Sequence, residues 1–264
     1  MSGKTSTRQA DTVQALAEQV RRIETGRRPD AHRVVTSGSP PLDRLLPEAG
    51  LRRGTLVEWL FPGIGSGAGT LAMLAAREAC REGGALVVVD RNRSFYPPGA
   101  AFWGLDLRQL IVVRPTNDSD DAWAWDQSLR SPAVAAVWGW PHLHDEQTLR
   151  RWQLAAEASG VMGLLLRPES VRSDPSWAEL RLLVEPVPIS RLPGARSRRR
   201  LRVELLRARG AIAGRSTQLE LDEETGHASE QEVLYETDQT VSPSRLHLAA
   251  QLAHPTPRQR SHRA

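Results

Sequence analysis

A glycine-rich stretch offers the clearest opportunity for chemistry in this sequence. It reads PGIGSGAGT over residues 62–70 and lies between an apolar run and a run rich in alanine and leucine. A strand, a glycine-rich loop and a helix in this order form a common cradle for nucleotide phosphates, because backbone N–H groups and the helix N-terminus face the anion. The candidate binding residues of this phosphate loop are Gly63, Gly65, Ser66, Gly67, Ala68, Gly69 and Thr70.

The loop lacks the lysine that a working version needs. A functional loop reads G-x-x-x-x-G-K-[ST], in which the lysine contacts the β- and γ-phosphates and the hydroxyl holds magnesium. Ala68 or Gly69 takes the lysine position, depending on the register, and Lys4 is the only lysine in the chain. We therefore expect a vestigial phosphate loop with no tightly held cofactor, at most weak nucleotide binding and no turnover.

The segments around the loop alternate between strand and helix patterns. Apolar runs predict buried strands over 51–60, 85–90, 110–115, 133–140 and 161–168. Helical patterns lie between them, over 71–81, 100–103, 118–130 and 146–159. This alternation predicts an α/β fold with a mainly parallel central sheet and helices on both faces. Alternating apolar residues then predict antiparallel C-terminal strands, over 180–184, 201–205 and 219–221.

The two ends of the chain differ from this α/β body. Apolar residues at helical spacing predict an amphipathic helix near the N-terminus, formed around Val13, Leu16, Val20 and Ile23. After residue 225 the apolar content falls, and an acidic stretch gives way to a basic one. The sequence thus predicts three parts: a helix and linker over 1–30, a core over 31–225, and a flexible, disordered tail over 226–264.

Composition narrows the class and the compartment. Cys80 is the only cysteine, which excludes an internal disulfide and any multi-cysteine metal site. His142 and His144 have no third ligand beside them, so we expect no metal. No apolar run approaches the ~18 residues of a membrane-spanning helix, and the first residues lack an apolar signal core. The sequence predicts a cytoplasmic protein without a membrane segment.

Charge is distributed unevenly along the second half of the chain. The formal net charge is +4, but residues 191–215 carry nine arginines against Glu204 alone, and residues 216–240 carry eight acids and no base. Three interpretations stay open for the arginines: contact with DNA phosphates, contact with an acidic partner, or a solvated sheet face paired with the acids that follow. The candidate contact residues are Arg198, Arg199, Arg200, Arg202, Arg207 and Arg209.

Two segments resemble the RecA-type recombinases, and the resemblance covers roughly residues 34–225. The first, VVTSGSPPLDRLLPEAGLRRGTLVEWL at 34–60, matches the recombinase pattern at Gly38, Leu42, Asp43, Gly50, Leu51, Gly54 and Glu58. The second spans 87–115 and matches at Asp90, Pro97, Gly104, Leu105, Asp106, Leu110 and Pro115. The resemblance implies a RecA-like core of the P-loop NTPase type.

The residues that carry recombinase chemistry are the ones that differ. Asn92 stands where the recombinases have a catalytic glutamate, and Trp138 stands where an aspartate would hold the magnesium shell. An amide cannot take a proton from an attacking water, so general-base hydrolysis lacks its base. Together with Ala68 in the loop, these differences predict a RecA-like body without ATPase activity. We therefore expect the protein not to be an enzyme.

This combination is similar to the ImuA-type RecA-like proteins of bacterial mutagenesis cassettes. The similarity rests on the helix at 11–24, the degraded loop at 63–70, and the stretches RRRLRVELLRARG and LELDEETG within 198–226. It implies an accessory or scaffold role in SOS-type DNA damage tolerance, that is, in error-prone translesion synthesis (SOS mutagenesis). The implied partners are an ImuB-like Y-family polymerase homologue and an error-prone DnaE-type polymerase, and RecA, a second copy or DNA are further candidates.

The resemblance also implies a location and a role for the N-terminal helix. It implies association with the nucleoid during DNA damage, and docking of the helix on a protomer or a partner. Two alternative functions stay open. One is a diverged DNA-dependent ATPase whose lysine is supplied by an arginine or by a neighbouring subunit. The other is a damage-induced inhibitor of cell division.

Overall fold

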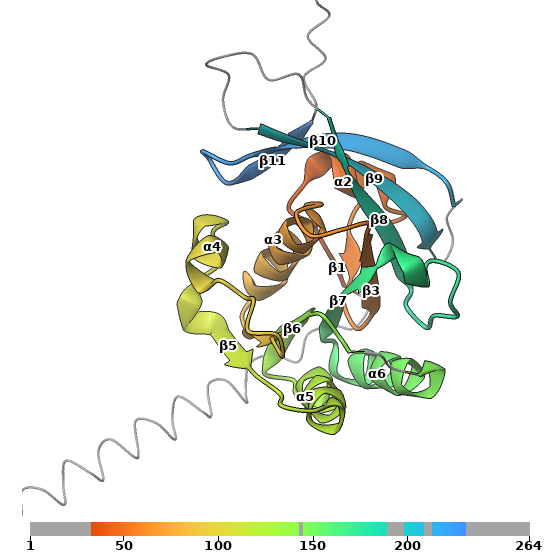
Figure 1. The fold of residues 1–264 in the computed structure, drawn as a ribbon. Helices are drawn as coiled ribbons and strands as arrows, with labels where there is room; N and C mark the ends of the chain where they lie inside the picture. The colour runs from red at the N-terminus through yellow and green to blue at the C-terminus, as the bar shows by residue number, and fades with distance from the viewer. Residues whose placement is uncertain (1–32, 143–144, 189–197, 209–212, 231–264) are drawn as a thin grey trace, which may run out of the picture. The chain divides into compact units, whose positions relative to one another are not determined.

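The computed structural model describes residues 33–142, 145–188, 198–208 and 213–230 (Figure 1). The predicted N-terminal helix, with Val13, Leu16, Val20 and Ile23, lies outside the described residues, as does Arg209. Within the described part, no helix has the length and apolar character needed to cross a bilayer.

Most of the described strands form one sheet with a parallel centre and an antiparallel side. Its order is β11-β10-β9-β8-β3-β7-β6-β4-β5. The parallel strands are β3 (Leu56–Phe61), β4 (Ala85–Val89), β5 (Leu110–Val113), β6 (Val134–Gly139), β7 (Met162–Pro168) and β8 (Leu180–Val187). The antiparallel strands are β9 (Arg198–Ala208), β10 (Ser216–Asp222) and β11 (His227–Glu230). The α/β class and the mainly parallel sheet are therefore confirmed.

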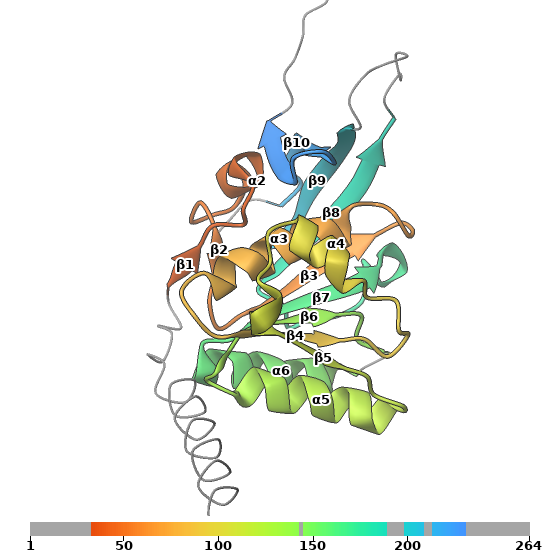
Figure 2. The same cartoon turned by 90° about the vertical axis from the view of Figure 1, so that its left-hand side faces the viewer.

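Helices cover both faces of the sheet, as the alternation of patterns predicts. Figure 2 shows α3 (Ala68–Cys80) and α4 (Pro97–Phe102) on one face, and α5 (Asp118–Arg130) and α6 (Glu146–Ser159) on the other. Each face has its own apolar core, since one cluster of buried residues gathers around α3 and a second around α5 and α6. Short 3-10 turns lie at Leu107–Gln109 and Glu169–Val171.

The structure differs from the predicted elements in four places. The predicted strand 51–60 is two strands, β2 (Leu51–Arg52) and β3, because β2 leaves the large sheet to pair with β1 (Val34–Val35). Strand β8, expected to be antiparallel, runs parallel to β3 and antiparallel only to β9. Helix α2 (Pro40–Leu45) is one short turn that starts on two prolines, too short for a helical periodicity. Strand β11 extends the sheet past the expected core boundary at 225.

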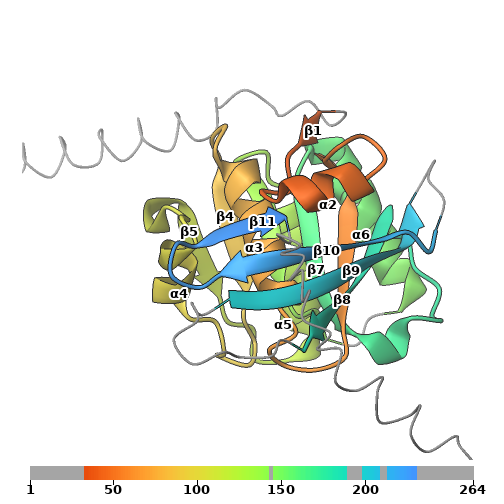
Figure 3. The ribbon, with the colours of Figure 1, turned by 90° about the horizontal axis from the view of Figure 1, so that it is seen from above.

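The antiparallel strands cross over the end of α3 that follows the phosphate loop (Figure 3). Their inward-facing leucines and valine are fully buried in the same cluster as α3, namely Leu201, Val203, Leu205, Leu219 and Leu221. Burying a leucine of this kind contributes about 1.5–3 kcal/mol. The crossing is therefore a core contact that fixes β9 above the candidate site.

Candidate functional site

The phosphate loop has the predicted order of strand, loop and helix. Strand β3 ends at Phe61 and α3 begins at Ala68, directly after Gly67. The loop is closed by its own contacts, because Ser66 N donates to the Gly63 carbonyl at 3.3 Å and Ala68 N donates to Ser66 Oγ at 3.3 Å. Gly67 has a φ of 92°, a left-handed conformation that favours glycine. The backbone scaffold of a phosphate site is therefore present.

A leucine from β9 packs against Gly67 at the end of this loop. A β-carbon at Gly67 would come within 2.5 Å of Leu201 Cδ1 and 2.8 Å of Leu201 Cδ2. The Leu201 side chain is fully buried, so its apolar group lies directly on the loop backbone. The contact packs the end of the loop against the hydrophobic core, whereas residues 62–65 of the loop are exposed.

An arginine on the same face of β9 also contacts the loop. Arg199 Nη1 donates to the Gly65 carbonyl at 3.2 Å, and Arg199 Nε lies 3.1 Å from Glu223 Oε1. The guanidinium is thus shared between a loop carbonyl and a carboxylate of the β10–β11 turn. This arginine, one of the candidate contact residues, fastens β9 to the loop.

The turn that presents Glu223 is ordered by backbone hydrogen bonds. Asp222 Oδ1 accepts from Glu224 N at 2.8 Å and from Thr225 N at 3.0 Å. These backbone N–H groups, that of Glu224 first, hold the pKa of Asp222 below its ordinary value. The stretch LELDEETG thereby has a structural role, because its turn fixes the acid that pairs with Arg199.

The position implied for the magnesium aspartate is filled by aromatic packing. Trp138 near the end of β6 is buried, and its Cζ2 would lie 3.6 Å from a β-carbon at Gly69. Its ring makes edge contacts with Phe95 and Trp140, at centroid distances of 5.5 and 4.7 Å. Among the described residues, no group of three His, Cys, Asp or Glu could hold a metal ion. Asn92 lies exposed in the turn after β4.

Three other arginines of β9 lie among acids. Arg198 and Arg200 contact the two oxygens of Glu220 at 3.2 and 3.0 Å. Arg202 lies 3.7 Å from Glu185 and 3.6 Å from Glu204. The register explains the pairing, since Arg200 stands directly opposite Glu220 on β10.

The remaining described arginine of the candidate set has a different role. Arg207 Nη1 donates to the Ser176 carbonyl at 2.6 Å. The arginine cluster of the sequence is therefore spread over three neighbourhoods: the phosphate loop, the acids of β8 to β10, and the segment before β8.

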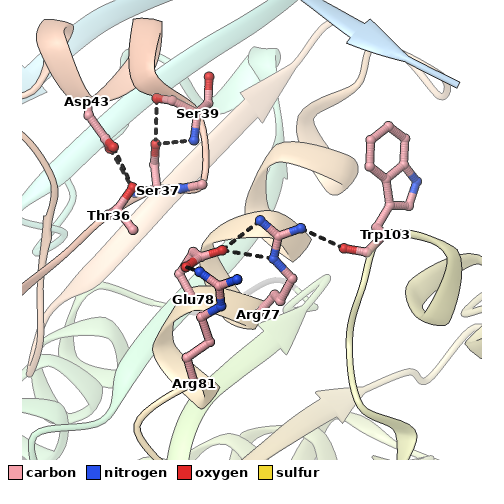
Figure 4. Close-up of polar contacts among 9 residues, drawn as sticks. Thr36, Ser37, Ser39, Asp43, Arg77, Glu78, Arg81 and Trp103 are labelled. Atoms are coloured by element: carbon pink, nitrogen blue, oxygen red, sulfur yellow. Dashed lines mark hydrogen bonds and ion pairs between the residues drawn. The ribbon is translucent and has the colours of Figure 1, made fainter. Parts of the chain in front are cut away.

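Two residues of the recombinase pattern lie in or beside the turn before α2, and Figure 4 shows the contacts of Asp43 there. Asp43 accepts hydrogen bonds from Thr36 Oγ1 and, at 2.7 Å, from Ser37 N, which shapes the turn before α2. Gly38 in this turn has a φ of 80°, and a β-carbon there would meet Leu74 Cβ at 3.3 Å. The pattern residues Gly38 and Asp43 thus serve the fold.

The surface of α3 beside this turn carries a second polar cluster (Figure 4). Glu78 is buried and accepts from Arg77 Nη2 at 2.6 Å and from Arg81 Nη1 at 2.9 Å. Arg77 Nη1 also donates to the Trp103 carbonyl at 2.9 Å, which attaches the segment after α4 to α3. Helix α3, which follows the phosphate loop, is therefore bonded to the segment after α4.

Sequence reasoning missed a buried charged network on the opposite face of β3. Glu58 is fully buried and lies 2.8 Å from Arg167 Nη1 on β7 and 2.6 Å from Arg181 Nε on β8. Arg181 also donates to the carbonyls of Val171, Arg172 and Asp174. The available signal was a charged residue inside each of three apolar strands. The network joins the segment before β8 to the centre of the sheet.

The sequence of this chain is similar to those of two kinds of known protein. Protein ImuA of Caulobacter vibrioides (strain NA1000 / CB15N) is 28% identical over 199 residues, which cover 69% of this chain and 81% of that protein. Protein RecA of Chlorobaculum tepidum is 35% identical over 104 residues, or 39% of this chain. The chain spans only 30% of the length of that RecA. No protein-family model matches.

A solved structure supports the fold independently. The RadB recombinase superposes with a TM-score of 0.58 at 16% sequence identity, over 75% of this chain and 99% of that chain. This likeness shows the recombinase fold, with its parallel sheet and antiparallel C-terminal strands. The chain therefore has the recombinase fold, and its sequence is similar to that of an ImuA-type RecA-like protein.

Proposed function

We propose that this protein is a non-catalytic accessory protein of error-prone translesion DNA synthesis. In this proposal the RecA-like body has kept its fold and lost ATP hydrolysis, and it serves to hold partners together. The similarity to ImuA, which extends over 81% of that protein, supports a role for this chain in a mutagenesis cassette. The partners we propose are an ImuB-like Y-family polymerase homologue and an error-prone DnaE-type polymerase.

The packing of Trp138 beside Gly69, at the end of a loop without a lysine, is the observation that supports the non-catalytic part. Leu201 packs against Gly67 from the hydrophobic core, whereas residues 62–65 of the loop are exposed, so a nucleotide could still approach the loop. Even then, the loop has no lysine to stabilise charge that develops on the phosphates in the transition state. Trp138 beside Gly69 adds an apolar wall where magnesium would need oxygen ligands.

Copurification tests the partner proposal. The full chain and the ImuB-like protein encoded in the same genome are coexpressed, with a tag on one of them only. We expect the two to elute together in size-exclusion chromatography at physiological salt, with or without ATP. Elution as two separate species at micromolar concentration would contradict the proposed role, because a scaffold must bind its partner stably.

One observation favours the alternative of an ATPase with a substitute for the lysine. Arg199 reaches the Gly65 carbonyl of the loop at 3.2 Å, so a guanidinium is already close to the phosphate site. If this arginine supplied the missing charge, Arg199→Ala would abolish hydrolysis that the unchanged chain performs. Its ion pair with Glu223 instead supports a structural role, because that carboxylate neutralises the charge that a phosphate would need.

A further inference from the structure

An open groove lined with arginines runs between α5 and α6. It has a volume of about 530 Å³ and is lined by Arg130 of α5 and by Gln147, Arg150, Arg151, Leu154 and Ala155 of α6. These helices cover the face of the sheet opposite α3, so the groove is separate from the phosphate loop (Figure 2). All three charged residues that line it are arginines.

The arginines are held in place by local contacts. Arg130 Nε lies 2.7 Å from Asp126 Oδ2, and Arg151 Nε lies 3.2 Å from Asp126 Oδ1, so the two guanidinium groups share one carboxylate. Arg150 lies 5.0 Å from the centre of the Trp177 ring, a cation–π contact. Positive charge therefore exceeds negative charge along the lining of the groove, and its geometry is already set before a ligand arrives.

The groove also exposes a large apolar side chain among these charges. Leu154 is 56% exposed, although it belongs to a helix whose other leucine, Leu149, is buried. An exposed leucine flanked by guanidinium groups presents an amphipathic surface. Such a surface is matched by a segment that carries both carboxylates and an apolar side chain.

We infer that the α5–α6 groove docks an acidic segment of a partner protein, with one large apolar side chain placed over Leu154. Guanidinium groups bind carboxylates through paired hydrogen bonds, which supplies the charge complementarity. A nucleic-acid backbone fits less well, because its phosphates gain nothing from Leu154. This inference rests on the proposed function, since it assigns a surface to the binding of a partner.

Short fluorescent peptides test the chemistry of the groove directly. The probe is rich in aspartate and glutamate around a central leucine, and the matched peptide has serine in place of that leucine. We expect the leucine peptide to bind the full chain with a dissociation constant in the micromolar range, weakening with salt. We expect the serine peptide to bind at least about tenfold more weakly, a difference of 1.4 kcal/mol.

Variants locate the binding site on the protein. Arg150→Glu with Arg151→Glu should weaken peptide binding by at least about tenfold. Leu154→Ser, which keeps all the ion pairs, should weaken only the leucine peptide. Arg93→Glu with Arg108→Glu, at exposed residues outside the groove, is the matched charge control and should leave binding unchanged. Failure of the leucine peptide to bind, or equal binding by the groove variants, overturns the inference, as does groove-dependent binding of single-stranded DNA in its place.

Copurification with the ImuB-like protein separates this inference from the proposed function. Loss of the partner by the arginine variant supports both. If that variant retains the partner, the inference about the groove is overturned and the proposed function stands. If the unchanged chain fails to bind the ImuB-like protein but binds the leucine peptide through the groove, the proposed function fails and the groove stands. Failure in both assays overturns both.

Discussion

Leu201 of β9 lies against Gly67 of the phosphate loop, close enough that a β-carbon at position 67 would come within 2.5 Å of its Cδ1. The contact joins the antiparallel side of the sheet to the loop whose sequence resembles a nucleotide site. Arg199 adds a hydrogen bond to the neighbouring Gly65 carbonyl at 3.2 Å. Gly67 at the end of the phosphate loop is thereby packed against the hydrophobic core, whereas residues 62–65 are exposed.

Gly67→Ala should destabilise the protein. The new methyl group meets Leu201, and the φ of 92° strains any residue with a β-carbon. Overpacking of this kind costs about 1–3 kcal/mol, and the backbone strain adds to it. Urea denaturation followed by fluorescence measures the loss in the free energy of unfolding.

Gly63→Ala is the matched control for the loop, because a β-carbon at Gly63 meets nothing within 4 Å. It should change the free energy of unfolding by less than about 0.5 kcal/mol. If Gly67→Ala were equally harmless, Leu201 would not be packed on the loop. In a double-mutant cycle, Gly67→Ala should cost less in a Leu201→Ala background.

Glu58→Gln should be among the most destabilising single changes in the sheet. The carboxylate balances Arg167 and Arg181 in a fully buried place, and the amide would leave both guanidinium groups without their counter-charge. Breaking a buried pair in this way costs about 3–5 kcal/mol. Glu185→Gln, at a surface residue 3.7 Å from Arg202, should cost no more than about 1 kcal/mol in the same assay.

Replacing Arg198, Arg200 and Arg202 together with glutamine should leave DNA affinity nearly unchanged. These side chains contact Glu220, Glu185 and Glu204, and the acids repel phosphate. Fluorescence anisotropy over a range of salt concentrations checks this with duplex DNA. If the three arginines did bind phosphates, each substitution would lower the log–log salt slope by about 0.9.

Cys80 should be inert toward thiol reagents in the folded protein. Burial raises the pKa of the Cys80 thiol to about 12, so almost none of it is thiolate at pH 8. The unfolded chain, with a pKa of about 8.5, should react quickly at that pH. Because the folded pKa is raised, the stability linked to this thiol is present below about pH 8.5 and is lost as the pH rises toward 12. Stoichiometric labelling of the native protein at pH 8 within minutes would contradict the burial.

The local part of the fold could be predicted from the sequence, because its signals are local. The parallel strands other than β8 are mainly apolar runs, and each long helix has its own periodicity or capping residue, such as Asn117 before α5. Helix α2 and strand β11 carry too few apolar residues to produce such a pattern. Only Ala228 has a buried side chain among the described side chains of β11.

The tertiary part of the site could not be predicted, because its partners are distant in the chain. Arg199 and Gly65 are 134 residues apart, and nothing near either residue indicates the other. The acids after β9 suggested a paired sheet face as one of three interpretations, and the register places Glu220 opposite Arg200 accordingly. The arginines of β9 make different contacts because β9 lies over the loop, and the sequence does not indicate that position.

Magnesium-dependent ATP hydrolysis by the purified full chain is the most direct test of the central claim, which is that this RecA-like body has no ATPase activity. The assay is run with and without single-stranded DNA, beside a RecA protein that shows the assay works. With Ala68 at the lysine position, Asn92 at the position of the catalytic glutamate and Trp138 beside Gly69, we expect no rate above the protein-free blank. Turnover of about one per second that Thr70→Ala abolishes would contradict the account.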